Sequence, residues 1–388
     1  MRLAERMGRL GTETAFEVLA KARALEAQGR DIVHLEIGEP DYDTPGNIIN
    51  AAKEALDGGM THYGPSPGLP DVRAGIAEET AVTRNIPVTA DNVVFTPGGK
   101  PIMFFVIMAL VDYGDEVLYP NPGFPIYESM INFSGGVPVP MQLHEETEFG
   151  VDLDEVRSKV SSKTKMMIVN SPNNPCGSIL SHENLKGLAE LAVENDIIIL
   201  ADEIYRRFMY EGTFESITQF PDTLDRTIIL DGFSKTYAMT GWRAGYGVMP
   251  EPLVEPISRL VTNSVSCTAA FTQVACLEAL QGPQEDAEGM VAEFKTRREL
   301  IVNGLNSIKG IRCVMPKGAF YVFPNVEDTG MTSREFADRL LDEGGVAALA
   351  GECFGEFGKG FLRFSFANSS ENIEKALERT NDFVNKNT

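Results

Sequence analysis

Basic residues are scarce in this sequence relative to acidic ones. The 388 residues include 34 lysines and arginines against 56 aspartates and glutamates, which gives a formal net charge of -22. So acidic a chain repels polyanions, which argues against nucleic acid and anionic membranes as partners. A small anionic ligand would have to be held by donors placed locally against the overall field.

Cysteine and histidine are few as well. The five cysteines form no CxxC pair and no zinc spacing, and an odd number excludes a complete disulfide framework, so we expect reduced thiols. The four histidines have no metal-site neighbourhood, and we expect them at the surface or at helix caps. The sequence therefore predicts no metal site.

Long apolar runs are absent. No stretch is apolar over the length that a bilayer requires. Residues Met1–Arg6 carry charges with no apolar core after them, which is not the pattern of a signal peptide, and we expect a cytoplasmic protein. No Gly-x-Gly-x-x-Gly follows an early strand either, which argues against a nicotinamide dehydrogenase.

Short β-rich runs alternate with helical stretches, which is the α/β pattern. Several runs are continuously apolar, as in a central sheet covered by helices on both faces. The runs are Val93–Thr96, Glu116–Tyr119, Met166–Val169, Ile197–Leu200, Thr227–Leu230 and Tyr246–Met249. A break at Leu280–Pro283 precedes a long charged helix around Glu285–Asn306 and two more β-rich segments, Gly318–Phe323 and Phe361–Phe366. The length suits one large domain and a smaller one that begins at about residue 283.

Residues that could bind a ligand or take part in chemistry follow the ends of these runs. Gly98–Lys100 follows the first, Asn174 the third, Asp202 the fourth and Lys235 the fifth. Ligands of α/β sheets bind at the carboxyl ends of the strands. Position and residue type therefore agree in predicting one site at this edge of the sheet.

Lys235 lies in a small-residue turn, and Arg243 follows eight residues later in the setting Gly-Trp-Arg-x-Gly. A lysine is usually a solvated surface charge, but Lys235 comes after the apolar run Thr227–Leu230. In a partly desolvated site its amine can lose a proton and form a Schiff base with an aldehyde. The fork of donors on Arg243 suits a phosphate. Together these residues predict pyridoxal 5'-phosphate (PLP) as cofactor.

The segment Gly232–Gly245 resembles the lysine signature of the class I aminotransferases, and the chain is similar to that family from about Asp31 to Ala367, with bacterial aspartate aminotransferase-like enzymes as the nearest group. The resemblance implies an α/β fold with a large PLP-binding domain, residues 45–282, around a mostly parallel seven-stranded sheet. It adds a smaller α+β domain of residues 1–44 and 283–388. It also implies a homodimer whose active site is shared across the interface.

The phosphate-binding residues are predicted partly from their chemistry and partly from the family resemblance. Gly98 and Gly99 precede an apolar helical run, and glycines at a helix N-terminus expose N–H groups to a phosphate, although such a pair can be a plain turn. The resemblance adds Ser234 and Arg243, and it implies that Tyr63 reaches the phosphate of the neighbouring subunit. Many relatives carry a hydroxyl where this chain has Gly232, so the phosphate contacts differ in detail.

The resemblance also assigns residues to the cofactor ring. Asp202 would pair with the protonated ring nitrogen and keep the ring an electron sink; a helix N-cap is the alternative. Tyr205 and Asn174 match residues that hydrogen-bond the ring oxygen, and Cys176 replaces the usual threonine of that motif. Phe124 matches the aromatic residue that stacks on the ring, against the alternative of a core phenylalanine.

Three residues are predicted to contact substrate in addition to Asn174. Arg363 lies between apolar residues on a probable strand and matches the clamp for the substrate α-carboxylate; an exposed edge-strand charge is the alternative. Gly38 matches a backbone position whose lack of a side chain leaves room for substrate. Lys100 matches a lysine that binds the distal carboxylate in some relatives, but it could also face the phosphate or solvent.

These assignments predict a ping-pong transamination between an L-amino acid and a 2-oxo acid. Lys235 would hold PLP as a Schiff base and then act as general base and acid, with Asp202 and Tyr205 completing the catalytic set. Lys100 favours aspartate or glutamate as donor, while alanine, aromatic and branched-chain donors stay open. A C–S β-lyase on the same scaffold is the second alternative. A regulator's aminotransferase-like sensor is disfavoured, because the family signature begins by Asp31 and the charge is acidic.

Overall fold

The structure, a computed structural model, describes residues 2–387 and is built around one large central sheet. The strand order is β2-β9-β8-β7-β6-β3-β4-β5. The five strands from β8 to β4 pair in parallel, and the pairs at both ends of the sheet are antiparallel. In sheet order the strands are β2 (Val93–Thr96), β9 (Gly245–Val248), β8 (Thr227–Gly232), β7 (Ile198–Asp202), β6 (Thr164–Asn170), β3 (Glu116–Asn121), β4 (Val137–His144) and β5 (Gly150–Val151).

The six β-rich runs of the sequence all form strands of this sheet, and the α/β fold class is confirmed. The sheet holds one strand more than the seven predicted, because the two-residue β5 pairs with the end of β4. Strand β4 was not predicted from the sequence. This strand contains Pro138 and Pro140, which donate no backbone hydrogen bond and are poor predictors of a strand.

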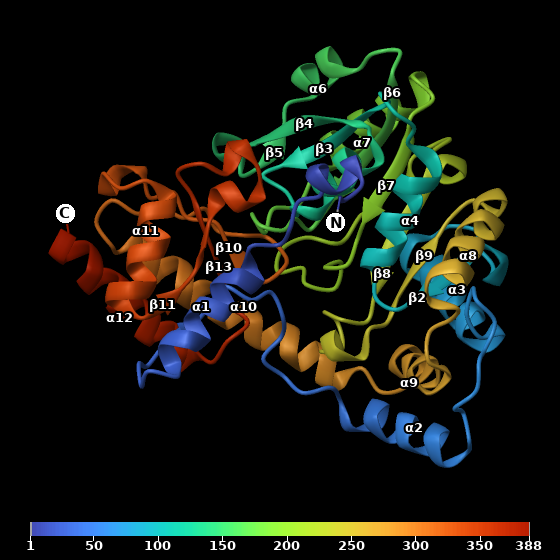
Figure 1. The fold of residues 1–388 in the computed structure, drawn as a ribbon, viewed down its shortest axis with the longest axis horizontal. Coiled ribbons are helices and arrows are strands. Elements are labelled where there is room, and N and C mark those ends of the chain that lie inside the picture. The colour runs from blue at the N-terminus through green and yellow to red at the C-terminus, as the bar shows by residue number, and fades with distance from the viewer. Residues whose placement is uncertain (1, 388) are drawn as a thin grey trace.

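Helices cover both faces of the central sheet (Figure 1). Successive residues of β6 point to opposite faces, and Ile168 and Val169 accordingly belong to different apolar clusters. Ile168 packs in the cluster of α4, α5 and α8, whereas Val169 packs in that of α7. The helices in this part of the chain are α2 (Gly46–Asp57), α3 (Pro70–Arg84), α4 (Lys100–Leu110), α5 (Ile126–Ser134), α6 (Leu153–Lys159), α7 (His182–Glu194), α8 (Glu251–Val265) and α9 (Ala270–Gln281).

The C-terminal elements gather with the N-terminal helix α1 at one side of the molecule (Figure 1). A three-stranded sheet has the order β10-β13-β12. Strand β1 pairs in parallel with β11, so the N-terminal segment that precedes the large sheet packs with the C-terminal segment that follows it. The domain boundaries at 44/45 and 282/283 stay predictions. These elements are α1 (Ala15–Glu26), β1 (Val33–His34), α10 (Glu285–Asn306), β10 (Tyr321–Val322), α11 (Ser333–Arg339), β11 (Val346–Ala347), β12 (Leu349–Ala350), β13 (Leu362–Ser365) and α12 (Ser370–Asn387).

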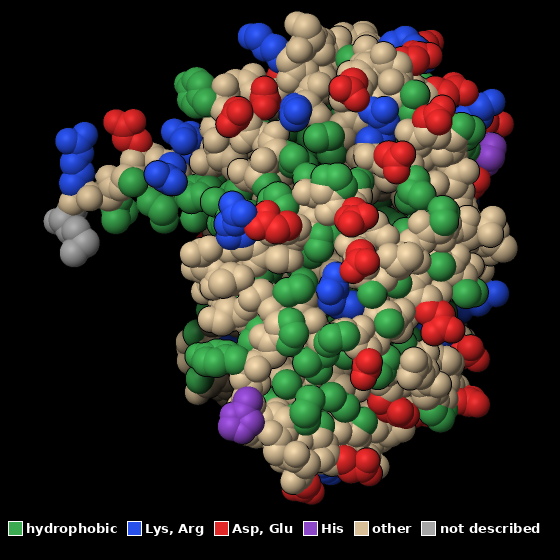
Figure 2. Space-filling model, turned by 90° about the vertical axis from the view of Figure 1, so that its right-hand side faces the viewer, with side chains coloured by type: hydrophobic (Ala, Val, Ile, Leu, Met, Phe, Trp, Pro, Cys, Tyr) green, Lys and Arg blue, Asp and Glu red, His purple; other side chains and the backbone are tan. Residues whose placement is uncertain are grey.

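The first residues of the chain form an arm that stands out from the body of the molecule (Figure 2). The arm contains the short 3-10 helix η1 (Glu5–Arg9), and every residue from Arg2 to Leu10 is exposed. Its base is held to α5 by a 2.9 Å hydrogen bond from Arg9 Nε to the carbonyl of Asn132. Among residues 2–387, no helix combines the length and apolarity that a bilayer crossing requires.

Candidate active site

A cavity of about 520 Å³ lies at the carboxyl ends of the central parallel strands. Its wall takes residues from the large sheet, from the segment around β1 and from β13. Eleven of the residues predicted from sequence line it, namely Gly38, Gly99, Lys100, Phe124, Asn174, Asp202, Tyr205, Ser234, Lys235, Arg243 and Arg363. Gly98 and Tyr63 are outside this lining: Gly98 is directly behind it, and Tyr63 is 89% exposed at the surface.

Lys235 follows β8 and extends into this cavity. Its Nζ donates a hydrogen bond to the carbonyl of Gly38 and is 5.9 Å and 5.7 Å from the ring centroids of Tyr205 and Phe320. Burial lowers the pKa of Lys235 to about 8, an effect that the nearby carboxylate of Glu13 opposes. The expectation of a partly desolvated lysine is therefore met, and a solvated surface position is excluded.

Asp202 ends β7 and is 7% exposed. Its Oδ2 accepts a 2.6 Å hydrogen bond from the hydroxyl of Tyr127, and its Oδ1 accepts one of 3.3 Å from the N–H of Ile204. Burial raises the pKa of Asp202 to about 6, although both hydrogen bonds act to lower it. No cation of the described residues forms an ion pair with this carboxylate. Tyr127, which lies on α5, is a residue that the sequence analysis missed.

Tyr205 is buried, and its hydroxyl is 2.7 Å from that of Tyr321, at the start of β10. Burial raises the pKa of both phenols, so both remain protonated at neutral pH. The sequence predicts Tyr321 within a β-rich run but indicates no role for it. The pair connects the loop after β7 to the smaller three-stranded sheet, and its two hydroxyls are positioned at the cavity wall.

Arg363 lies on β13 and is 4% exposed, which excludes the alternative of an exposed edge-strand charge. Its Nη1 donates a 3.1 Å hydrogen bond to Asn174 Oδ1, and its Nη2 bonds the carbonyl of Glu36. Its Nε is buried without a hydrogen-bond partner among the described residues. A buried guanidinium with a donor unused and no carboxylate paired to it suits an anionic ligand.

Gly98 and Gly99 form the turn between β2 and α4, with the guanidinium of Arg243 against Gly98. A Cβ at Gly98 would meet Arg243 Nη2, and the backbone there has a φ of 97° that glycine adopts readily. Arg243 itself is held by a 2.8 Å hydrogen bond from Nη1 to the carbonyl of Thr240. The first turn of an 11-residue helix and a guanidinium therefore converge on one wall of the cavity.

Phe124 and Lys100 are neighbours in the cavity. Lys100 Nζ is 5.4 Å from the Phe124 ring centroid, and it forms an ion pair with Glu13, from the turn before α1. Phe124 also packs edge-on against Tyr127, with ring centroids 5.7 Å apart. Glu13 was missed by the sequence analysis, because its partner is 87 residues away in the chain.

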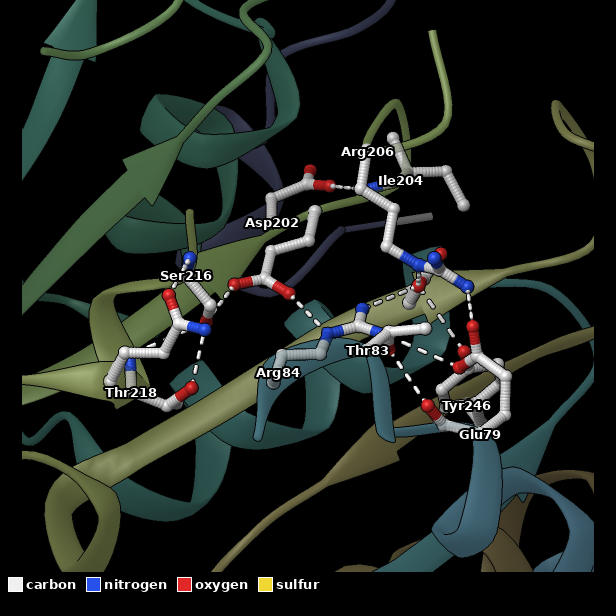
Figure 3. A network of polar contacts seen from close by, with 12 residues as sticks. Glu79, Thr83, Arg84, Asp202, Ile204, Arg206, Ser216, Thr218 and Tyr246 are labelled. Atoms are coloured by element: carbon white, nitrogen blue, oxygen red, sulfur yellow. Dashed lines mark hydrogen bonds and ion pairs between the residues drawn. The ribbon is translucent and has the colours of Figure 1, made fainter. Parts of the chain in front are cut away.

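A buried network of charges supports the two strands that carry Asp202 and Lys235 (Figure 3). Arg84, at the end of α3, is fully buried and donates to Glu203 at 2.9 Å and to Asp231 at 2.7 Å. Although burial opposes its charge, Glu203 and Asp231 hold the pKa of Arg84 above its usual range. Glu203 directly follows Asp202, and Asp231 lies on β8, so Arg84 joins the two strand ends.

Known proteins resemble this chain over nearly its whole length. The family model described as aminotransferase class I and II matches residues 30–379. The aspartate aminotransferase of Pyrococcus abyssi is 41% identical over 90% of this chain and 91% of its own. Aromatic-amino-acid aminotransferase 2 of Thermococcus litoralis is 37% identical over 98% of this chain and 97% of its own. The structure of aspartate aminotransferase from Thermus thermophilus with maleate has a TM-score of 0.94 at 37% identity, covering 98% of this chain and 100% of that one.

Proposed function

The chain belongs to the class I and II aminotransferases and is a transaminase, and we propose that it uses PLP to move an amino group between aspartate or glutamate and a 2-oxo acid. One observation carries the proposal. Lys235 follows β8, Asp202 ends β7 and Arg363 lies on β13, and all three line one cavity. Lys235 is an amine of lowered pKa, and Arg363 is a guanidinium with an unused donor. Asp202 is a buried carboxylate that pairs with no cation among residues 2–387.

The residues present fit PLP in charge and in space. The N-terminus of α4 and Arg243 offer donors to a phosphate, and the absence of a side chain at Gly98 leaves room for the Arg243 guanidinium beside that turn. The buried carboxylate of Asp202 lacks a cation that a protonated ring nitrogen would supply. Phe124 offers an apolar ring face in the same cavity. When bound, PLP supplies an aldehyde carbon for amines and an electron sink for charge developing at the substrate Cα.

Lys235 is suited to bind the cofactor and to carry the substrate proton. With a pKa of about 8, roughly a tenth of its Nζ is unprotonated at pH 7 and can attack a carbonyl carbon, far more than for an ordinary lysine. The same atom can then accept the proton from the substrate Cα and return it to the product, which are the general-base and general-acid steps of the transfer. The rings of Tyr205 and Phe320 lie near Nζ and contribute to its desolvation.

Arg363 and Asn174 are positioned to orient the substrate. The hydrogen bond between them fixes the guanidinium plane, and no carboxylate of the described residues pairs with Arg363, so its charge remains for the α-carboxylate. Gly38 contributes by lacking a side chain, because a Cβ there would meet the Tyr321 hydroxyl. Because the hydroxyls of Tyr205 and Tyr321 bond each other, one of the two keeps a proton that it can donate toward an oxygen of the ring.

Lys100 supports a dicarboxylic donor. It is the remaining cavity lysine that could bind a second carboxylate, and Glu13 already demonstrates that its ammonium pairs with one. The relative from Pyrococcus abyssi is named aspartate aminotransferase, and the Thermus thermophilus structure was determined with maleate. An aromatic donor is the second candidate, favoured by the apolar side chains of Phe16, Leu19 and Met103 in the cavity wall.

The surface supports a homodimer. The N-terminal arm exposes Leu3, Met7 and Leu10 by 69%, 43% and 40%, and Tyr63 is exposed by 89%. Exposed apolar side chains on a projecting segment are stabilised when a second chain covers them. In a dimer the Tyr63 hydroxyl would be free to reach the partner's phosphate group. Equilibrium sedimentation should give twice the mass of one chain, and a monomeric mass at micromolar concentration would contradict the proposal.

A half-reaction tests the function directly. The PLP-loaded protein is mixed with single amino acids, and the visible spectrum of the cofactor and the 2-oxo acid released are recorded. Aspartate or glutamate should convert the cofactor most efficiently, Lys235→Ala should convert none, and Lys186→Ala, at an exposed site on α7, should behave as wild type. Better conversion by alanine or phenylalanine would overturn the dicarboxylate assignment alone. No conversion by any amino acid would overturn the proposed function.

A further inference from the structure

The turn before α1 places the carboxylate of Glu13 beside Lys100, the cavity cation that an acidic substrate side chain would need to bind. Glu13 Oε2 accepts a hydrogen bond from Lys100 Nζ, and both residues line the cavity. We propose that Glu13 is a specificity-determining residue, which competes with the distal carboxylate of a substrate for Lys100 and so reduces the preference for dicarboxylic over uncharged side chains. The proposal rests on the proposed function, because it concerns the substrate of the same site.

The Lys100 ammonium is fixed where Glu13 can reach it. Lys100 is the first residue of α4, and its Nζ is 5.4 Å from the ring centroid of Phe124 and 6.0 Å from that of Phe16. Glu13 is joined to α1 by the 3.4 Å hydrogen bond from the N–H of Phe16 to its carbonyl. The side chain of Glu13 is 22% exposed, against 46% for Lys100, so the carboxylate is the more enclosed partner.

Two cations of the cavity wall, Arg363 and Lys100, differ in whether a carboxylate already pairs with them. Arg363 pairs with no carboxylate among residues 2–387, so its charge is available to a carboxylate. Lys100 is already paired. A substrate with an uncharged side chain leaves the pair of Lys100 and Glu13 intact. A dicarboxylic substrate must displace Glu13 or place a second anion beside it, and either event costs binding free energy.

The charge of Glu13 also reaches the catalytic amine. Its carboxylate acts to raise the pKa of Lys235, while Arg363 and Lys100 act to lower it. Removal of this charge therefore alters the binding of every anion to some degree. A test of specificity must compare two ligands that differ only in the charge of the distal group.

Succinate and its half-amide, succinamate, form such a pair, and neither has an amino group to transfer. Their dissociation constants for the PLP-loaded protein are measured by isothermal titration calorimetry. Glu13→Gln should lower the Kd of succinate about fivefold, which is about 1 kcal/mol, and change that of succinamate less than about twofold. Glu17→Gln, which removes the same charge from an exposed position on α1, should change neither. In the Lys100→Gln background the effect of Glu13→Gln should vanish.

An equal change for both ligands, or no tightening of succinate in Glu13→Gln, would overturn the role of Glu13. Persistence of the effect without Lys100 would overturn it too, because the competition is for that ammonium. The half-reaction with amino acids decides the proposed function separately. If the wild type transaminates alanine far better than aspartate while Glu13→Gln still tightens succinate, the dicarboxylate assignment fails and the role of Glu13 stands.

Discussion

The hydroxyl of Tyr127 donates a 2.6 Å hydrogen bond to Oδ2 of Asp202 and thereby joins helix α5 to the end of strand β7. Tyr127 is fully buried, and burial raises the pKa of its phenol well above the usual value, so it keeps the proton that it donates at neutral pH. The bond favours the charged form of Asp202 against the desolvation that disfavours it. Tyr127 therefore helps to keep this carboxylate ionised.

Replacement of Tyr127 by phenylalanine should weaken PLP binding. A hydrogen bond to a charged group is worth about 1.5–3 kcal/mol, which corresponds to an increase in Kd of roughly tenfold to a hundredfold. Because the pKa of Asp202 rises further without the bond, the loss should be larger at pH 6.5 than at pH 8.5. Equilibrium dialysis of apoprotein against PLP at both values measures it.

Tyr119→Phe is the matched control for this experiment. Tyr119 is also a buried tyrosine of this region, but its hydroxyl donates to Glu128 at 3.0 Å, and it does not line the cavity. Its loss should leave PLP affinity unchanged within a factor of about two. Equal losses in the two variants would show that the Tyr127 bond has no specific effect on the cofactor site.

Asp202→Asn should stabilise the apoprotein at neutral pH while it abolishes turnover. Burial raises the pKa of Asp202 from 3.8 to about 6, so between these values the folded chain holds a proton that the unfolded chain has released. Folding stability therefore falls as pH rises through this window, and above it the charged carboxylate costs about 3 kcal/mol. The gain in the variant should be near zero at pH 4 and about 3 kcal/mol at pH 8.

Urea unfolding of the apoproteins at pH 4 and pH 8 measures this gain. Asp196→Asn is the control, because Asp196 lies at the surface with a side chain 97% exposed. Its replacement should give the same small change in the free energy of unfolding at both pH values. A stability difference for Asp202→Asn that does not depend on pH would contradict the raised pKa.

Residue type and position at strand ends sufficed to bring Lys235 and Asp202 to one site, because parallel strands end at the same edge of a sheet. Arg363 lies on β13 of the smaller antiparallel sheet and was predicted from its apolar neighbours and the family resemblance. Tyr127, Tyr321 and Glu13 could not be found in this way. Each acts on a partner 75, 116 or 87 residues distant, through contacts that only the packed fold creates. Strand β4 was missed for a local reason, since its two prolines hide the β pattern.

Gly38→Ala should impair both substrate binding and turnover. A Cβ at this position would meet the hydroxyl of Tyr321, and that hydroxyl is 2.7 Å from the hydroxyl of Tyr205. Overpacking of this kind costs about 1–3 kcal/mol, so kcat/KM should fall roughly fivefold to a hundredfold. Gly46→Ala, on α2 with open space around its Cβ, should retain wild-type kinetics. Equal kinetics in the two variants would exclude a steric requirement for glycine at residue 38.

Arg84→Met should destabilise the fold and, through it, the strand ends that carry the site. The variant leaves the carboxylates of Glu203 and Asp231 buried and removes the cation that bonds both at 2.9 Å and 2.7 Å. Loss of one partner from a buried ion pair costs about 3–5 kcal/mol, because the remaining charge is uncompensated. Arg206 still donates to Asp231 at 2.7 Å, so Glu203 bears most of that cost.

Urea unfolding of the PLP-loaded protein measures the effect of Arg84→Met, with Arg259→Met as control. Arg259 forms an exposed ion pair with Glu255 on α8, and its loss should cost less than about 0.5 kcal/mol. Adding Glu203→Gln to Arg84→Met should restore part of the stability, because the uncompensated carboxylate is then neutral. If the double variant is no more stable than Arg84→Met, the cost arises from lost packing and not from the buried charge of Glu203.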